Sequence, residues 1–190
     1  ISNDLTVVSI AIEMMATKEE NIKNKAFSAI NRSVNLIEKI RILESTMSTK
    51  YTLKKINIDQ VLNVIKKTYP SVNVKISGEC DVMADEAFIS VIDNIINNSI
   101  THGKTDRIDI EINSDEDLCW MKISDYGKGI PDEIKDRIFD EEFSYGETRG
   151  TGLGLYIVKK TIERYGGSIK LEDTHPKGAT FIITLNKSKL

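Results

Sequence analysis

The chain has 190 residues, of which 40% are hydrophobic and 29% charged. This is the composition of a soluble globular protein, and the length is enough for one ordinary domain or for a small domain with a helical appendage. The formal net charge of −3 gives no general attraction for nucleic acid or anionic lipid, so any phosphate site must be built locally. We therefore expect no nucleic-acid partner.

No apolar run in the sequence approaches the roughly 20 residues that span a bilayer, and the start lacks a basic-then-apolar secretory pattern. We predict no membrane contact in this segment and a cytoplasmic location, with a membrane anchor upstream of Ile1 left open. Cys80 and Cys119 form no disulfide framework and have no metal-ligand spacing. Cys119 shares a predicted strand face with Met121 and Ile123, which favours a buried free thiol over a redox role.

The first 50 residues follow a helical period. Apolar side chains recur at steps of three and four from Ile1 to Met15 and, after a polar break over 17–21, from Ile22 to Met47. This pattern predicts two helices in an antiparallel hairpin. Because the apolar stripe is wider than one partner helix would cover, we expect two copies of the chain to form a four-helix bundle. A hairpin packed on its own C-terminal domain is the alternative.

From residue 51 onward the period changes. Helical patterns cover residues 58–69, 86–102 and 153–165, and strand patterns cover 72–77, 107–112, 118–124, 168–173 and 179–185. Mostly antiparallel strands with helices on one face make a two-layer α/β sandwich. The predicted fold class is α+β, with a helical hairpin over residues 1–50 and the sandwich over 51–190.

Two asparagines stand out in the predicted helix over 86–102. Asn94 and Asn98 lie four residues apart, so they share one strip of the helix surface beside its apolar stripe. Asn is a poor mid-helix residue because its amide competes for backbone groups. The pair therefore indicates either a bound ligand or a solvated polar face.

Two glycine-containing segments follow. Asp125 directly follows a predicted strand, where its carboxylate can accept a hydrogen bond from a base amino group, and Gly127 and Gly129 let the main chain turn close to a ligand. Residues 150–155 place three alternating glycines before a helix, which exposes main-chain N–H groups as an anion cradle. This segment is neither a P-loop nor a dinucleotide fingerprint. Taken singly, each segment has an alternative interpretation: an ordinary acidic turn for the first and a flexible hinge for the second.

Taken in order, residues 94–99, 125–130, 138–143 and 150–155 resemble the N, G1, F and G2 boxes of sensor histidine kinases. Residues 178–181, Gly-Ala-Thr-Phe, resemble the last-strand motif of the same family. Four boxes in the right order and spacing are specific even though each alone is weak. The resemblance implies the ATP-binding fold shared with gyrase, Hsp90 and MutL, with ATP and Mg²⁺ as cofactors.

The resemblance also implies roles for single residues. Asp125 would bind the adenine amino group with Thr180 nearby, and His102 would lie beside the nucleotide. Asn98 would be the Mg²⁺ ligand, with Asn94 close to the metal and phosphates. The other expected nucleotide contacts are Gly127, Gly129, Ile130, Phe143, Gly150, Thr151, Gly152, Leu153, Gly154 and Leu155. Arg149, in a lid over residues 141–149, is expected to neutralise phosphate charge during catalysis.

Residues 1–8 resemble the helix that follows the phosphoacceptor His of that family. In this register the acceptor lies two residues before Ile1, and Asn3 takes a role in phosphatase activity. The implied function is an ATP-dependent protein-histidine kinase that phosphorylates a His on the dimerisation helix and then an Asp in a response-regulator receiver domain. A non-catalytic nucleotide-binding signalling module is the alternative, and the hairpin disfavours a clamp or chaperone ATPase of the same fold.

Overall fold

The computed structural model describes residues 52–141, 143, 145 and 153–188, together with Ala26, Ile30, Ser33 and Ile37. The chain divides into two compact units, Ile1–Thr49 and Lys50–Leu190. The four described residues of the first unit are all helical. The rest of the predicted hairpin, and with it the predicted four-helix bundle, lies outside the described residues.

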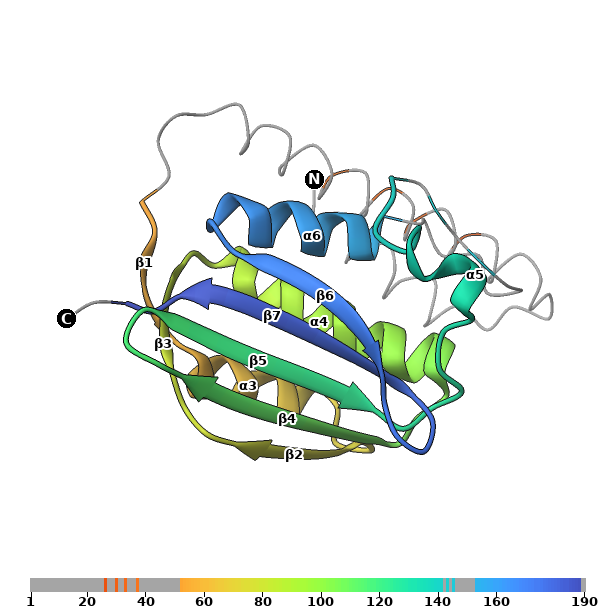
Figure 1. Ribbon diagram of the computed structural model, residues 1–190. Coiled ribbons are helices and arrows are strands. Elements are labelled where there is room, and N and C mark those ends of the chain that lie inside the picture. The colour runs from red at the N-terminus through yellow and green to blue at the C-terminus, as the bar shows by residue number, and fades with distance from the viewer. Residues whose placement is uncertain are drawn as a thin grey trace. The chain divides into compact units, whose positions relative to one another are not determined.

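The second unit is built on a five-stranded sheet with the order β2-β4-β5-β7-β6 (Figure 1). Its strands are β2 (Asn73–Ser77), β4 (Arg107–Ser114), β5 (Leu118–Asp125), β6 (Ser168–Asp173) and β7 (Ala179–Asn186). β2 and β4 are parallel, and the other neighbouring strands are antiparallel. A separate two-stranded sheet pairs β1 (Lys54–Asn57) with β3 (Asp81–Ala84), which the sequence did not predict.

Helices α3 (Ile58–Thr68), α4 (Ala87–Asn98) and α6 (Gly154–Arg164) cover one face of this sheet (Figure 1). α4 continues into a π-helical turn, η1 (Ser99–Gly103), and the short helix α5 (Asp132–Lys135) follows β5. This arrangement confirms the two-layer α/β sandwich. Within the described ranges, no helix is long and apolar enough to cross a membrane.

The core lies between the sheet and the helices because each strand turns alternate side chains toward them. The buried side chains include Ile108, Ile110, Met121, Ile123, Phe181 and Ile183 from the sheet and Phe88, Ile92, Ile95, Val158 and Ile162 from the helices. Cys119 and Cys80 are buried free cysteines, as Cys119 was predicted to be. Burial, and then the contact with Cys80, raises the pKa of the Cys119 thiol, so this thiol stays protonated and unreactive.

A single carboxylate joins the end of α6 to the start of α4. The hydroxyl of Tyr165 donates to Asp85 Oδ1, and Arg164 Nη2 lies 2.7 Å from Asp85 Oδ2. The main-chain N–H of Ala87 also donates to Asp85 Oδ1, at 3.0 Å. Tyr165 is 3% exposed and its ring packs against Phe88 at a centroid distance of 6.4 Å. This cluster fixes the spacing of α4 and α6 at one end.

Tyr165→Phe should destabilise the domain by about 1–2 kcal/mol, because it removes a hydrogen bond to a partly buried carboxylate and keeps the ring. Urea unfolding at pH 7 should show a lower midpoint with an unchanged m value. Tyr156→Phe is the matched control on the same helix, since its ring keeps its contact with Lys160. Equal midpoints for the two variants would contradict this role of the Asp85 cluster.

Candidate functional site

Asp125 ends β5, and its carboxylate is buried, with 3% of the residue exposed. Oδ1 accepts hydrogen bonds from the main-chain N–H groups of Gly127 at 2.9 Å and Ala179 at 3.2 Å. Oδ2 accepts one from the hydroxyl of Ser99 at 3.1 Å. An ionised carboxylate has about four lone-pair positions, so Oδ2 keeps one position for a ligand. Asp125 is therefore an oriented acceptor at the inner end of the site.

The turn after Asp125 packs directly against η1 and the start of β7. A Cβ on Gly127 would lie 2.3 Å from the carbonyl oxygen of Gly103, and one on Gly178 would lie 2.0 Å from the carbonyl oxygen of Asp125. Gly178 also has a φ of +140°, which residues with a side chain rarely adopt. The N–H of Lys128 donates to the carbonyl of Gly103 at 2.9 Å. The main chain thus closes around Asp125 where side chains would not fit.

Asn94 and Asn98 lie one turn apart on α4 and face the first residue of α6. The Nδ2 group of Asn94 donates to the carbonyl of Ser90 at 2.8 Å, which leaves Oδ1 available on the other side of the amide. A Cβ on Gly154 would lie 2.9 Å from Asn94 Oδ1 and 3.9 Å from Asn98 Nδ2. The structure therefore brings together the predicted asparagine pair and the described part of the glycine segment over residues 150–155.

His102 lies in η1, half-buried beside the turn that contains Lys128. Burial, and then the positive charges of Lys128 and Lys104, lower its pKa below the usual imidazole range. The ring is therefore neutral at pH 7. Lys104 has a left-handed backbone with a φ of 59° and ends the π-helical turn.

The other described residues predicted for the site are apolar. Ile130, Phe143 and Leu155 are partly buried against the core, and Leu153 is 7% exposed at the start of α6. The guanidinium of Arg137 lies over the Phe143 ring, 4.8 Å from its centroid.

The hydroxyl of Thr180 does not point toward the Asp125 carboxylate, and its place beside the nucleotide stays a prediction. Its hydroxyl lies 2.9 Å from that of Ser124, its partner in the strand register, and 2.7 Å from that of Thr174. Neighbouring residues of a strand point to opposite faces, so Thr180 lies on the sheet face opposite the Asp125 carboxylate. The contact that the last-strand motif does make with Asp125 comes from the main chain of Ala179.

Five predicted site residues lie outside the described residues: Asn3, Arg149, Gly150, Thr151 and Gly152. In contrast, the surroundings of Asp125 include residues that the sequence analysis did not assign to the site. Ser99, Gly103, Gly178 and Ala179 all contact Asp125 or its turn. The sequence contains one indication that Ser99 has a special role: it is a hydroxyl-bearing residue within an otherwise apolar stripe of its helix.

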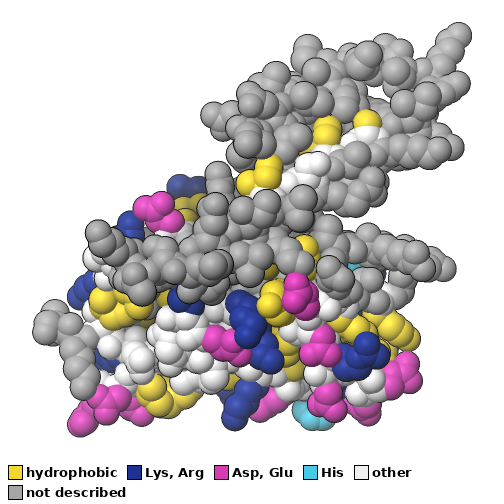
Figure 2. All heavy atoms as spheres, turned by 90° about the horizontal axis from the view of Figure 1, so that it is seen from above, with side chains coloured by type: hydrophobic (Ala, Val, Ile, Leu, Met, Phe, Trp, Pro, Cys, Tyr) yellow, Lys and Arg dark blue, Asp and Glu magenta, His cyan; other side chains and the backbone are white. Residues whose placement is uncertain are grey.

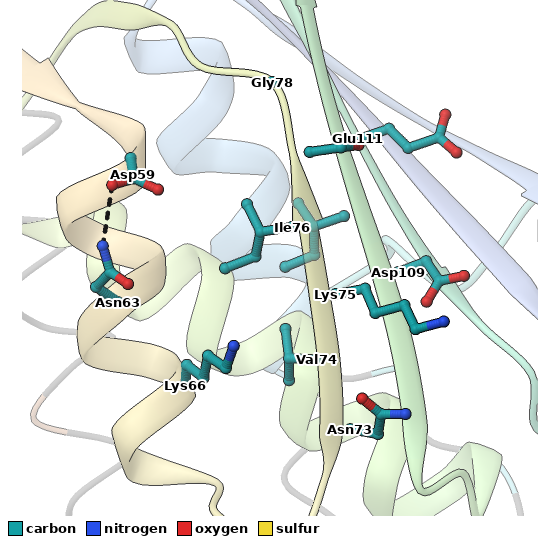
Figure 3. Close-up of a pocket in the computed structure, with 12 residues that line it drawn as sticks. Asp59, Asn63, Lys66, Asn73, Val74, Lys75, Ile76, Gly78, Asp109 and Glu111 are labelled. Carbon is teal, nitrogen blue, oxygen red and sulfur yellow. Dashed lines mark hydrogen bonds between the residues drawn. The ribbon is translucent and has the colours of Figure 1, made fainter.

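A separate cleft of about 770 Å³ lies between α3 and the edge strand β2 (Figure 3). Asp59, Asn63 and Lys66 line it from the helix, and Val74 and Ile76 line it from the strand. None of the residues predicted to bind a nucleotide lines this cleft.

On the molecular face shown in Figure 2, the described Lys and Arg side chains are interspersed with Asp and Glu side chains, so neither positive nor negative charge dominates this face.

Residues 83–189 match the family model of the "Histidine kinase-, DNA gyrase B-, and HSP90-like ATPase", and the chain belongs to this family. Its homologues are sensor histidine kinases, and its ATPase-family domain supports the use of ATP.

Three curated relatives illustrate the match. Sensor histidine kinase WalK of Bacillus subtilis is 34% identical over 103 residues, which are 50% of this chain and 17% of WalK. Sensor protein SrrB of Staphylococcus aureus is 39% identical over 103 residues, or 51% of this chain and 18% of SrrB. Sporulation kinase A of Bacillus subtilis is 29% identical over 177 residues, or 93% of this chain and 27% of that kinase. The chain thus spans less than a third of these relatives.

Solved structures agree on the fold. The catalytic domain of histidine kinase ThkA matches with a TM-score of 0.64 and 25% identity, covering 72% of this chain and 97% of that one. The Acinetobacter baumannii histidine kinase AdeS matches with a TM-score of 0.67 and 18% identity, covering 98% of this chain and 95% of that one. The second likeness concerns the fold alone.

Gly154→Ala should weaken binding of ATP by about 10- to 150-fold, the range that the loss of one charge-assisted contact gives. The added methyl group would lie 2.9 Å from Asn94 Oδ1 and so displace this amide. Stability should be kept, because alanine is the better helix former. Isothermal titration and urea unfolding measure the two effects separately. Wild-type affinity in a folded variant would show that the Asn94–Gly154 contact has no part in binding.

Proposed function

We propose that this chain is the catalytic part of an ATP-dependent protein-histidine kinase of a two-component system. One observation carries the proposal: Ser99, at the end of α4, links the oriented acceptor Asp125 to the helix that carries Asn94 and Asn98, and the two amides meet the glycine start of α6. This arrangement occurs in a chain whose relatives are sensor histidine kinases.

The adenine half of the site would form around Asp125. The 6-amino group of adenine donates to the open acceptor position of Asp125 Oδ2, a hydrogen bond to a charged group. Gly127 and Gly129 form the floor, and the neutral ring of His102 and the side chain of Ile130 pack near the base. Phe143, Leu153 and Leu155 complete the apolar surroundings of the nucleotide.

The phosphate half would form between α4 and the start of α6. Mg²⁺ prefers oxygen ligands, keeps several waters and needs few protein groups. The asparagine pair fits such an ion, since an amide oxygen of Asn98 can bind it while Asn94 lies close by. Because Mg²⁺ takes few protein ligands, the phosphates and water would supply the remaining ones. Among the described residues, no three His, Cys, Asp or Glu side chains cluster as metal ligands.

The first N–H groups of α6 and the segment Gly150, Thr151 and Gly152 before it would hold the phosphates, since helix starts favour anions. Phosphoryl transfer depends mostly on positioning and on neutralising charge. Bound Mg²⁺ supplies charge neutralisation at the phosphates, and Arg149 would add a positive charge.

The wider reaction also needs a phosphoacceptor and a receiver domain. The helices over residues 1–50 would dimerise and present the phosphoacceptor His. The receiver domain of a response regulator would take the phosphoryl group onto an Asp, and Asn3 would assist the reverse hydrolysis. The rival proposal is a signalling module that binds nucleotide without phosphorylating a His.

Asn98→Ala should make ATP binding nearly independent of added Mg²⁺, because it removes the proposed protein ligand of the ion. Isothermal titration of ATP with Mg²⁺ and with EDTA measures this dependence. Asn97→Ala is the matched control on the exposed side of the same helix. A magnesium dependence equal to that of the wild type in Asn98→Ala would assign the ion to another residue.

Phosphorylation separates the kinase from the rival module. A chain extended upstream to carry the acceptor His, incubated with γ-labelled ATP, should gain an acid-labile, base-stable phosphoryl group and pass it to a receiver domain. Residues 1–190 alone should bind ATP without this label, because His102 and His175 lie outside the hairpin. An acid-stable label on residues 1–190 would contradict the scheme, and ATP binding without any label on the extended chain would favour the rival module.

A further inference from the structure

Ser99 holds Oδ2 of Asp125, the oxygen to which no described main-chain group donates a hydrogen bond. Its hydroxyl donates to Asp125 Oδ2 at 3.1 Å, across 26 residues of sequence, and both residues are 3% exposed. The two main-chain donors, Gly127 and Ala179, both bind Oδ1. Among the described contacts, Ser99 therefore supplies the only protein hydrogen bond to Oδ2.

The π-helical turn fixes this hydroxyl in place. Ser99 begins η1, and its carbonyl accepts the N–H of Lys104, which ends the turn. Gly103, at the end of η1, accepts the N–H of Lys128 from the turn that follows Asp125. The two ends of η1 thus contact the two ends of the segment from Asp125 to Lys128. Such wide helical turns are often found at functional sites.

The Ser99 bond has two consequences for a ligand. A carboxylate held at both oxygens cannot rotate freely about its Cβ–Cγ bond, which is otherwise a soft torsion. The Ser99 proton is also engaged, so at this point the site presents an acceptor and no donor. A base with an amino group can donate to Oδ2, whereas a base with an oxo group at the same position would place its lone pairs against a buried carboxylate.

We infer that Ser99 is a positioning residue that makes this site select a 6-amino purine over a 6-oxo purine. The inference rests on the proposed nucleotide site, and it assigns base selection to a pair, Asp125 with Ser99, instead of to Asp125 alone. Without the hydroxyl, Asp125 can turn away from the base, and the acceptor at Oδ2 is no longer held toward the amino group.

ADP and inosine diphosphate test this, because their bases differ at position 6 by an amino and an oxo group. Titration of the chain with each nucleotide gives the ratio of the two affinities. The wild type should prefer ADP by on the order of 100-fold or more, since a site built to bind a polar group strongly rejects the analogue without it. In Ser99→Ala, ADP affinity should fall about 5- to 20-fold and inosine diphosphate affinity much less, so the ratio narrows.

Two further variants separate positioning from a general effect on structure. Ser99→Thr keeps the hydroxyl and should keep the ratio. Thr174→Val removes another buried hydroxyl, which lies 2.7 Å from Thr180 on the opposite sheet face, and should leave the ratio unchanged. Urea unfolding of each variant confirms that the domain is folded.

Each outcome has a distinct meaning. An equal loss for both nucleotides in Ser99→Ala, or an unchanged ratio, overturns the role of Ser99 and leaves the proposed ATP site standing. A wild type that binds neither ADP nor ATP overturns the proposed function and this inference together. A narrowed ratio in Ser99→Ala, restored in Ser99→Thr, supports the positioning role.

Discussion

The buried carboxylate of Asp125 is the constraint on which the site depends. A buried charge is costly unless it is hydrogen-bonded, and here the donors come from η1, from the turn after β5 and from β7. Ser99 lies 26 residues before Asp125 in sequence, and Ala179 lies 54 residues after it. The requirement to satisfy one carboxylate therefore holds three distant segments in a single arrangement.

A second constraint is the close approach of α4 and α6. Near the C-terminal end of α6, Asp85 joins Tyr165 and Arg164 to the start of α4. At its N-terminal end, the absence of a side chain on Gly154 leaves room for the Asn94 amide. The hydrogen bonds of Asp85 hold α4 and α6 together at one end, and the missing side chain of Gly154 allows the two helices to lie close at the other. The spacing between α4 and α6 is thus fixed where the two asparagines face the start of α6.

Much of this fold follows from local patterns in the sequence. The strands over 107–114 and 118–125 alternate cleanly, and α3 and α6 were predicted to within a few residues, because hydrophobic period depends on neighbours in sequence. The pairing of β1 with β3 was missed, since each has only four residues and their contact joins segments on either side of α3 and β2.

The site was predictable where its chemistry is local. The asparagine pair and the glycines of the turn after Asp125 could be predicted because their spacing is visible in the sequence alone. The last-strand motif does not by itself say which of its residues faces Asp125, because strand alternation decides this in the folded sheet. Ser99 was missed because its role depends on a partner that only the folded chain brings near.

The parallel pairing of β2 with β4 has a consequence for folding. Residues 73–77 and 107–111 can pair only after the connection between them, which contains β3, α4 and η1, has been closed into a loop. Contacts of such large sequence separation form slowly, because chain entropy is lost before the contacts compensate for it. The helix that carries Asn94 and Asn98 is part of this loop, so the site and the sheet are expected to form in one cooperative step. A nucleotide that binds only the completed site then stabilises the whole domain through mass action, by about 2.7 kcal/mol at a ligand concentration 100 times its Kd.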